Sequence, residues 1–164
     1  MTGFRITTKI DDNSRVRIKL DGSMDEHSDF SAAPSEFIEE VVFDFDDVDH
    51  INSTGIKHWV QWISSVQQKN QNLKFTFINC PKPIVDQINM VDGFLPANSK
   101  VKSFKVPFFC ETCDKDMTFT FVYGREYDKK DGKLVLDIPS NRCERADCEM
   151  EPDVVEQKYF KFLK

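Results

Sequence analysis

The chain has 164 residues, a net charge of −6 and 40% hydrophobic residues, among them 15 phenylalanines. This composition can build a core and argues against global disorder, and the negative charge argues against a general affinity for nucleic acid. No apolar run approaches the roughly 18 residues of a membrane span, and the first residues form no apolar signal segment. We therefore expect a cytoplasmic protein.

The chain begins with the pattern of a β-hairpin. Residues 4–10 and 16–20 alternate apolar and polar side chains, as half-buried strands do. Turn-forming residues occupy positions 11–14 between them. The first two strands are therefore expected to be antiparallel neighbours.

The next clear pattern is a strand, a polar turn and an amphipathic helix. Residues 41–45 form a β-rich run, residues 46–55 are mostly polar, and a helical pattern follows at once. Its apolar side chains recur at the spacing of one helix face, at Ile56, Trp59, Val60, Ile63 and Val66. This succession predicts one half of an α/β unit.

Two features around this helix are open from the residues alone. Residues 26–40 contain Pro34 and few apolar residues, so at most a short helix is expected there. Trp62 lies off the apolar face of the following helix. It is either exposed, as part of a partner surface, or covered by Phe30 or Phe37.

The segment at residues 43–56, Phe-Asp-Phe-Asp-Asp-Val-Asp-His-Ile-Asn-Ser-Thr-Gly-Ile, resembles the signature of STAS domains, the fold of the anti-sigma-factor antagonists. In that family a D-x-I-D-S-S-G-like turn joins a strand to a helix, and its first Ser is the regulatory phosphorylation site. Ser53 matches that Ser, Thr54 the second hydroxyl position and Gly55 the glycine. Asn52 departs from the Asp that is usual in the family. The resemblance implies a mixed β-sheet with helices on one side.

The resemblance also implies a non-enzymatic regulator of transcription that signals by binding. Its partner would be an anti-sigma factor or a related serine kinase, released when Ser53, or alternatively Thr54, is phosphorylated. The implied contact surface consists of Asp49, Asn52, Ser53, Thr54, Gly55 and Ile56. One alternative is a STAS-like scaffold without phosphoregulation. A further alternative for Ser53 is a plain helix N-cap, which contributes about 1 kcal/mol.

The acidic run before the helix predicts no catalytic or calcium site. Paired carboxylates catalyse acid–base chemistry when one of them is buried with a shifted pKa, whereas a dense acidic run is typical of a solvated loop. The run also lacks the Gly and the final Glu of an EF-hand. His50 and His58 have no partner at a metal-binding spacing, so we interpret both as surface or core-edge residues.

The remainder of the first domain continues the alternation of strand and helix. Residues 73–78 form an apolar strand, and residues 81–83, Pro-Lys-Pro, open a further helix that Gly93 could end. Residues 101–106 are either the last strand of this sheet or a bridge to a second domain. The C-terminal helix of the STAS family has no counterpart here, so the second domain is expected to cover that surface. The helix predicted to start at residues 81–83 has an apolar stripe that consists of Ile84, Ile88 and Val91.

Four of the five cysteines lie in the last third of the chain, as a C-x2-C pair and a C-x4-C pair. Two close thiolate pairs can meet around one tetrahedral Zn²⁺, and a site closed by four cysteines is structural, since a catalytic zinc keeps a position for water. Four buried, reduced cysteines are the alternative. Cys80 is interpreted as a small buried hydrophobe. The predicted zinc ligands are Cys110, Cys113, Cys143 and Cys148.

The segments around these cysteines are rich in β pattern. Residues 117–123 and 133–138 flank a turn at 128–132, and residues 154–163 offer a third strand. This arrangement resembles a zinc ribbon. We therefore predict a STAS-like domain at residues 1–99 and a zinc ribbon at residues 100–164. Nucleic-acid binding through the ribbon is a third hypothesis, although the ribbon has no basic excess.

Overall fold

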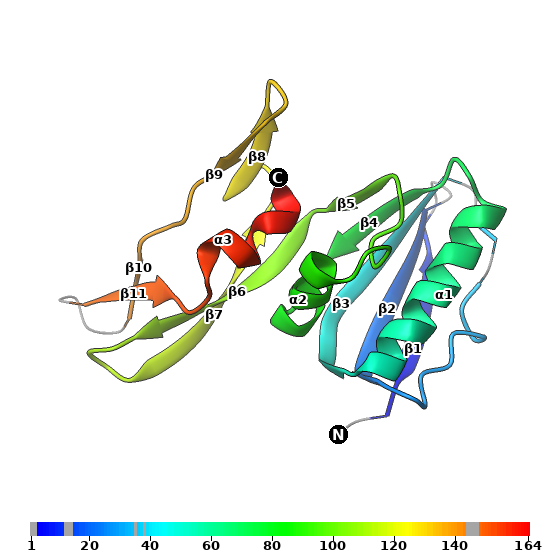
Figure 1. The fold of residues 1–164 in the computed structure, drawn as a ribbon, viewed down its shortest axis with the longest axis horizontal. Helices are drawn as coiled ribbons and strands as arrows, with labels where there is room; N and C mark the ends of the chain where they lie inside the picture. Colours follow the sequence, from blue (N-terminus) through cyan, green and yellow to red (C-terminus); the bar gives the residue numbers. More distant parts are fainter. Residues whose placement is uncertain (1–2, 12–14, 35, 38, 144–147) are drawn as a thin grey trace.

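The computed structural model describes residues 3–11, 15–34, 36–37, 39–143 and 148–164. It is a mixed α/β structure made mostly of strands (Figure 1). The helices are α1 (Ser53–Lys69), α2 (Lys82–Met90) and α3 (Glu156–Tyr159), and a 3₁₀ turn, η1 (Lys161–Leu163), follows α3. The strands are β1 (Arg5–Ile10), β2 (Arg15–Met24), β3 (Glu40–Ile51), β4 (Lys74–Ile78), β5 (Ser99–Val101), β6 (Ser103–Cys110), β7 (Lys115–Val122), β8 (Tyr127–Lys130), β9 (Lys133–Leu136), β10 (Asn141–Arg142) and β11 (Glu149–Pro152).

The first five strands form one sheet in the order β1-β2-β3-β4-β5. β1 is antiparallel to β2, which confirms the predicted hairpin, although its turn at 12–14 lies outside the described residues. The other neighbouring strands are parallel. α1 connects β3 to β4 and α2 connects β4 to β5. Since such crossovers are right-handed, both helices lie on the same face of the sheet (Figure 1).

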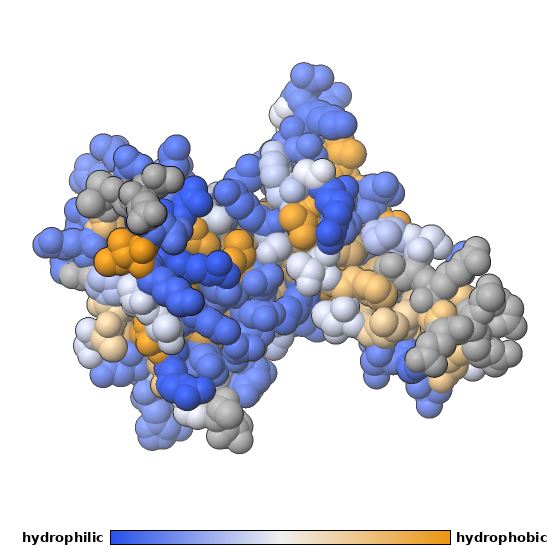
Figure 2. Space-filling model, turned by 180° about the vertical axis from the view of Figure 1, so that it is seen from behind, coloured by the Kyte–Doolittle hydropathy of each residue, from blue (hydrophilic) through white to orange (hydrophobic). Residues whose placement is uncertain are grey.

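The opposite face of this sheet carries charged side chains that pair across the strands. Arg17 on β2 lies 2.9 Å from Asp44 on β3, and Lys19 lies 2.6 Å from Asp47. Seen from this side, the surface over the sheet is mostly hydrophilic (Figure 2). The sheet therefore has one apolar face, beneath the helices, and one face of ion pairs.

β3 is longer than the sequence predicted. The acidic run that we assigned to a polar turn at 46–55 continues as strand to Ile51, so that prediction was wrong and only Asn52 separates strand from helix. The strand keeps its pairing with β2 through two register shifts, and Val48 and Ile51 point into the core while the acids are exposed. Because β2 satisfies the backbone of the acidic run, its polar side chains do not end the strand.

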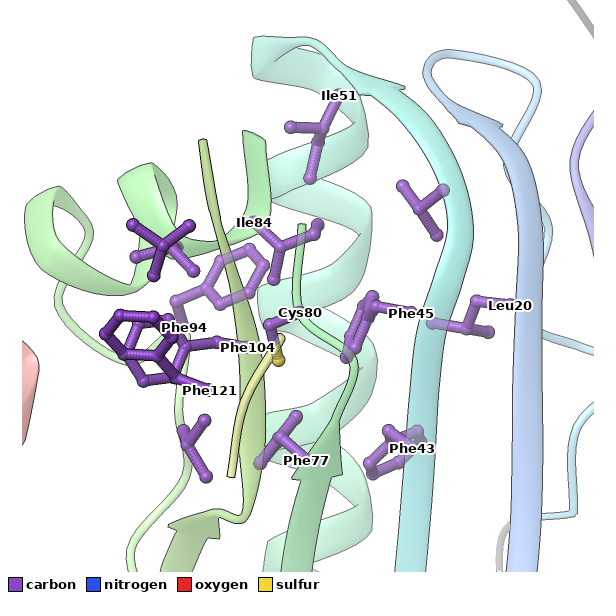
Figure 3. Packing of buried hydrophobic residues seen from close by; sticks show 14 of the residues in the cluster. Leu20, Phe43, Phe45, Ile51, Phe77, Cys80, Ile84, Phe94, Phe104 and Phe121 are labelled. Carbon is purple, nitrogen blue, oxygen red and sulfur yellow. The ribbon is translucent and has the colours of Figure 1, made fainter. Parts of the chain in front are cut away.

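Aromatic side chains fill the space between the sheet and the helices. Phe43, Phe45 and Phe77 lie on adjacent strands and are fully buried (Figure 3). Trp59 of α1 packs edge-on against Phe43 at 5.1 Å between ring centroids, and its indole N–H donates to the carbonyl of Phe94 at 2.9 Å. Burying each such side chain stabilises the fold by roughly 1.5–3 kcal/mol. The face of α1 predicted from its periodicity is thus the face that the core covers.

The segment between β2 and β3 contains no helix among its described residues, in line with the expectation of at most a short one. It contributes Phe30 and Phe37, both buried, as a cover for α1. The ring of Phe30 stacks on Trp62 with centroids 5.1 Å apart. Of the two alternatives for Trp62, the structure therefore supports the covered one.

Residues 101–106 fulfil both of the roles that we considered. β5 pairs with β4 in the first sheet, and β6, after Lys102 alone, enters a second sheet with the order β10-β11-β6-β7. β8 and β9 form a separate hairpin that turns at Asp131 and Gly132, both with positive φ. The turn predicted at 128–132 was therefore too long, because residues 128–130 belong to β8, and the strand predicted at 117–123 pairs with β6 and not with β9. The buried apolar residues of the two halves form one continuous cluster.

The C-terminal segment differs from our prediction. We expected a third strand at 154–163, but this segment forms α3 and η1 and packs on α2. The side chain of Asn89 on α2 donates to the carbonyl of Tyr159 and accepts from the N–H of Phe162, both at 2.9 Å. Alternating apolar residues alone do not distinguish a strand from a short helix, and here the contact with α2 decides.

Candidate metal centre and the N-terminus of helix α1

The four predicted zinc ligands lie together at one end of the second sheet. Cys110 ends β6, and Cys113 lies in the turn that leads into β7. Cys143 follows β10, and Cys148 precedes β11. Pairing of β11 with β6 brings the two cysteine pairs, which are far apart in the sequence, to the same place. The four residues between Cys143 and Cys148 lie outside the described residues.

The sulfur atoms have the spacing and chemistry that a metal ion requires. All four Sγ atoms lie within 4.8 Å of one another. Cys113 is 3.3 Å from Cys143, and Cys143 is 3.4 Å from Cys110. Four sulfurs at 2.3 Å from a tetrahedral Zn²⁺ would be about 3.8 Å apart, which is close to the two separations given above.

Cys143 and Cys148 form a disulfide in this structure, so both could ligate a metal ion as thiolates only after its reduction. A disulfide between these two would not require Cys110 and Cys113 to converge on the same point, whereas a metal ion would. Cys110, Cys143 and Cys148 are buried and Cys113 is half-buried, so the cluster is largely closed to solvent. The four cysteines could therefore hold one metal ion, and the described residues contain no other comparable group of candidate ligands.

The second predicted site, the start of α1, has a different cap from the one considered in the sequence. Asn52 is the N-cap, because its side-chain oxygen accepts from the N–H of Gly55 at 2.9 Å. Our alternative interpretation of Ser53 as the N-cap was therefore wrong. Ser53 is the first helical residue, its side chain is exposed, and its hydroxyl has no hydrogen bond within the described part of the chain.

Gly55 is required by a close approach of backbone to backbone. A Cβ atom at this position would lie 2.0 Å from the carbonyl oxygen of Met24 at the end of β2. The N–H of Asn52 donates to the same carbonyl at 3.0 Å. These contacts hold the first turn of α1 against the sheet and fix the direction in which Ser53 points. Thr54 and Ile56, also in the predicted contact surface, are half-buried.

Acidic side chains surround this helix start. The Asn52 amide donates to Glu26 at 3.0 Å, and the hydroxyl of Ser23 donates to Asp49 at 3.0 Å. Hydrogen bonds from its own backbone N–H and from Asn52 lower the pKa of Glu26, so this carboxylate is ionised at neutral pH. The site is an exposed hydroxyl on a positive helix terminus with an acidic rim.

Asp44, the buried acid of β3, has its own partners. Burial by itself would raise its pKa, but hydrogen bonds from Arg17, from Asn79 at 3.1 Å and from the N–H of Asp46 lower it. A carboxylate held in its charged form in this way braces the sheet. The sequence did not predict this network, because Asn79 comes from another strand end and adopts a positive φ of 55°.

The remaining candidates lie apart from both sites. His50 is exposed, as expected, and His58 is half-buried, with a buried Nδ1 that finds no hydrogen-bond partner in the described residues. Cys80 is fully buried among apolar residues (Figure 3), and burial raises the pKa of its thiol. It is therefore the inert hydrophobe that we predicted.

Comparison with known proteins adds no family or relative to this description. No protein-family model matches the chain, and neither the curated proteins nor the solved structures contain a match. Among the described residues, no helix is both long enough and apolar enough to cross a membrane.

Proposed function

We propose that this protein is a non-enzymatic, STAS-like regulator that binds an anti-sigma factor or a related serine kinase through the start of α1 and releases it when Ser53 is phosphorylated. The observation that carries the proposal is the exposed Ser53 hydroxyl on the first turn of a helix locked to the sheet by Gly55 and Asn52. The mixed sheet with both crossover helices on one face agrees with the resemblance.

Phosphorylation would change this surface by electrostatics alone. A phosphate adds about −1.5 to −2 charges, which the unpaired N–H groups at the start of α1 tolerate. The same group would join Glu26 and Asp49 and make the rim strongly negative. A partner patch that is acidic or apolar would then be repelled. The helix itself would remain intact, so the switch is in binding.

The test compares Ser53→Asp with Ser53→Ala against each candidate serine kinase or anti-sigma factor from the same cell. We expect Ser53→Asp to weaken binding at least tenfold and Ser53→Ala to bind as the wild type does. Ser64→Asp is the matched control, since Ser64 is exposed in the middle of the same helix. Equal binding by both Ser53 variants counts against the switch. Native mass spectrometry after kinase treatment should show one phosphate, absent in Ser53→Ala.

A STAS-like scaffold without phosphoregulation is the second candidate, and Asn52 favours it. This residue stands at the position of the family's usual Asp, and its amide is engaged both as the cap and with Glu26. A kinase that requires an acidic residue directly before the serine would not recognise this sequence. Binding of a partner together with failure of every kinase to modify Ser53 would select this function.

We further propose that the four cysteines hold one structural Zn²⁺, making residues 100–164 a zinc ribbon. The convergence of four largely buried cysteines supports this assignment, which requires the Cys143–Cys148 disulfide to be reduced. The surface near the metal centre opposes the nucleic-acid hypothesis, because Glu111, Glu149, Glu151 and Asp153 line a shallow cavity there. Only nucleic-acid binding whose affinity falls steeply with salt concentration would support that hypothesis.

A further inference from the structure

A cavity of about 340 Å³ lies where the two halves of the molecule meet. Its walls come from the end of the first sheet, the β8–β9 hairpin and the C-terminal residues, which lie together (Figure 1). Figure 2 shows apolar side chains next to strongly hydrophilic ones at the base of this hairpin. The volume is at the small end of the range for ligand pockets, about 300–1,000 Å³.

The walls of the cavity are mostly apolar and aromatic. Leu95, Leu134 and Phe162 contribute apolar surface from three separate segments. Tyr127 is buried, and its hydroxyl donates to the carbonyl of Val101 at 2.5 Å. Since burial also raises the pKa of Tyr127, its phenol is neutral and its ring acts as wall. A flat or short apolar group would fit against these surfaces.

The charged groups that line the cavity are both lysines. The Nζ atom of Lys100 lies 3.6 Å from the centroid of the Tyr123 ring, which holds it at the rim. Lys129, on β8 of the hairpin, lines the same cavity. Within the described part of the chain, neither lysine has a carboxylate at ion-pair distance. The neighbouring Asp128 is hydrogen-bonded to Tyr123 and to the N–H of Lys129, and the more distant charge of Lys100 contributes to lowering its pKa.

We propose that this cavity binds a small organic anion, with its apolar body against Tyr127 and Leu134 and its carboxylate or sulfonate between Lys100 and Lys129. Two ammonium groups beside apolar walls attract an anion and disfavour a cation, and Asp128 offsets only part of the charge of Lys100. The chain carries a net charge of −6, so this local positive site stands out from the field of the whole protein. The inference is independent of the Ser53 switch.

The test uses 8-anilinonaphthalene-1-sulfonate, an aromatic anion whose fluorescence rises in apolar sites, titrated against the folded full chain. We expect saturable binding that weakens about fivefold in Lys100→Gln and in Lys129→Gln. Lys102→Gln and Lys130→Gln are the matched controls, because each neighbours a pocket lysine without lining the cavity. Both controls should bind as the wild type does.

A second probe and a second surface make the result decisive. N-phenyl-1-naphthylamine has the same aromatic body without the sulfonate, so its binding should be weaker and indifferent to the lysine substitutions. Met90→Ser alters the other apolar groove, between α2 and α3, and should leave sulfonate binding unchanged. The proposal is overturned by absence of saturable binding, by equal losses in all four lysine variants, by a loss in Met90→Ser, or by equal affinity for the two probes.

Discussion

Replacing Gly55 with alanine should destabilise this protein, although the substitution lies in a helix, where alanine is normally preferred. Alanine has an intrinsic helix propensity about 1 kcal/mol better than glycine. Here, however, the new Cβ would lie 2.0 Å from the Met24 carbonyl oxygen and 2.4 Å from its carbon. Both are backbone atoms, so no side-chain rotation relieves the clash. The start of α1 and the end of β2 must move apart.

The size of the effect follows from what that movement breaks. Ordinary contact begins at 3.4 Å, so the two backbones must separate by about 1.4 Å. The hydrogen bond from Asn52 to Met24 would be lost at about 1 kcal/mol, the strained cap would lose up to about 1 kcal/mol, and overpacking costs roughly 1–3 kcal/mol. After subtracting the gain in propensity, we expect a loss of about 1–4 kcal/mol.

Equilibrium urea unfolding, followed by tryptophan fluorescence, measures this directly, because Trp59 and Trp62 both lie in α1. Ser64→Ala is the control: it gains helix propensity at an exposed position of the same helix and should be stabilising by about 0.5 kcal/mol or less. The contrary result is a Gly55→Ala variant as stable as the wild type while Ser64→Ala behaves as expected. That result would mean that α1 and β2 separate at this contact with little loss of unfolding free energy. The structural reason given for this glycine would then be wrong.

Two further predictions concern the metal centre and the buried acid. Cys110→Ser should reduce bound zinc from one equivalent to none and lower the melting temperature by more than 10 °C, since structural zinc supplies about 10 kcal/mol of apparent folding energy; Cys80→Ala should keep its zinc, and metal retained in Cys110→Ser would contradict the ligand set. Asp44→Asn should lower the unfolding free energy at pH 7. Because the folded-state pKa of Asp44 is lowered, its stabilisation is present above the unfolded pKa of about 3.9 and disappears as the pH falls through the folded value. The difference between wild type and variant in urea should therefore be constant from pH 7 to 5 and shrink below pH 4, and a difference that grows on acidification would refute it.

Local patterns in the sequence were sufficient for several elements of this fold. Alternation predicted the first hairpin, and the 3.6-residue period identified the buried face of α1, with Trp59 and Ile63 in the core. The proline pair placed the start of α2. The spacing of the cysteines predicted a cluster that the structure brings within 4.8 Å. In each case the information lies within a few residues, because periodicity and turn chemistry depend on the chain's own geometry.

Other features depended on segments that are distant in the sequence. The acidic run is a strand because it pairs with β2. Residues 154–163 form α3 and η1 because they pack on α2 and hydrogen-bond with Asn89. The cavity between Lys100 and Lys129 likewise needs both halves of the molecule. Even Gly55, visible as a motif residue, is explained only by the Met24 carbonyl. The sequence by itself determined which faces of each element are apolar and which residues can ligate a metal. Tertiary structure decided which backbones meet, because pairing and close approach are properties of two segments at once.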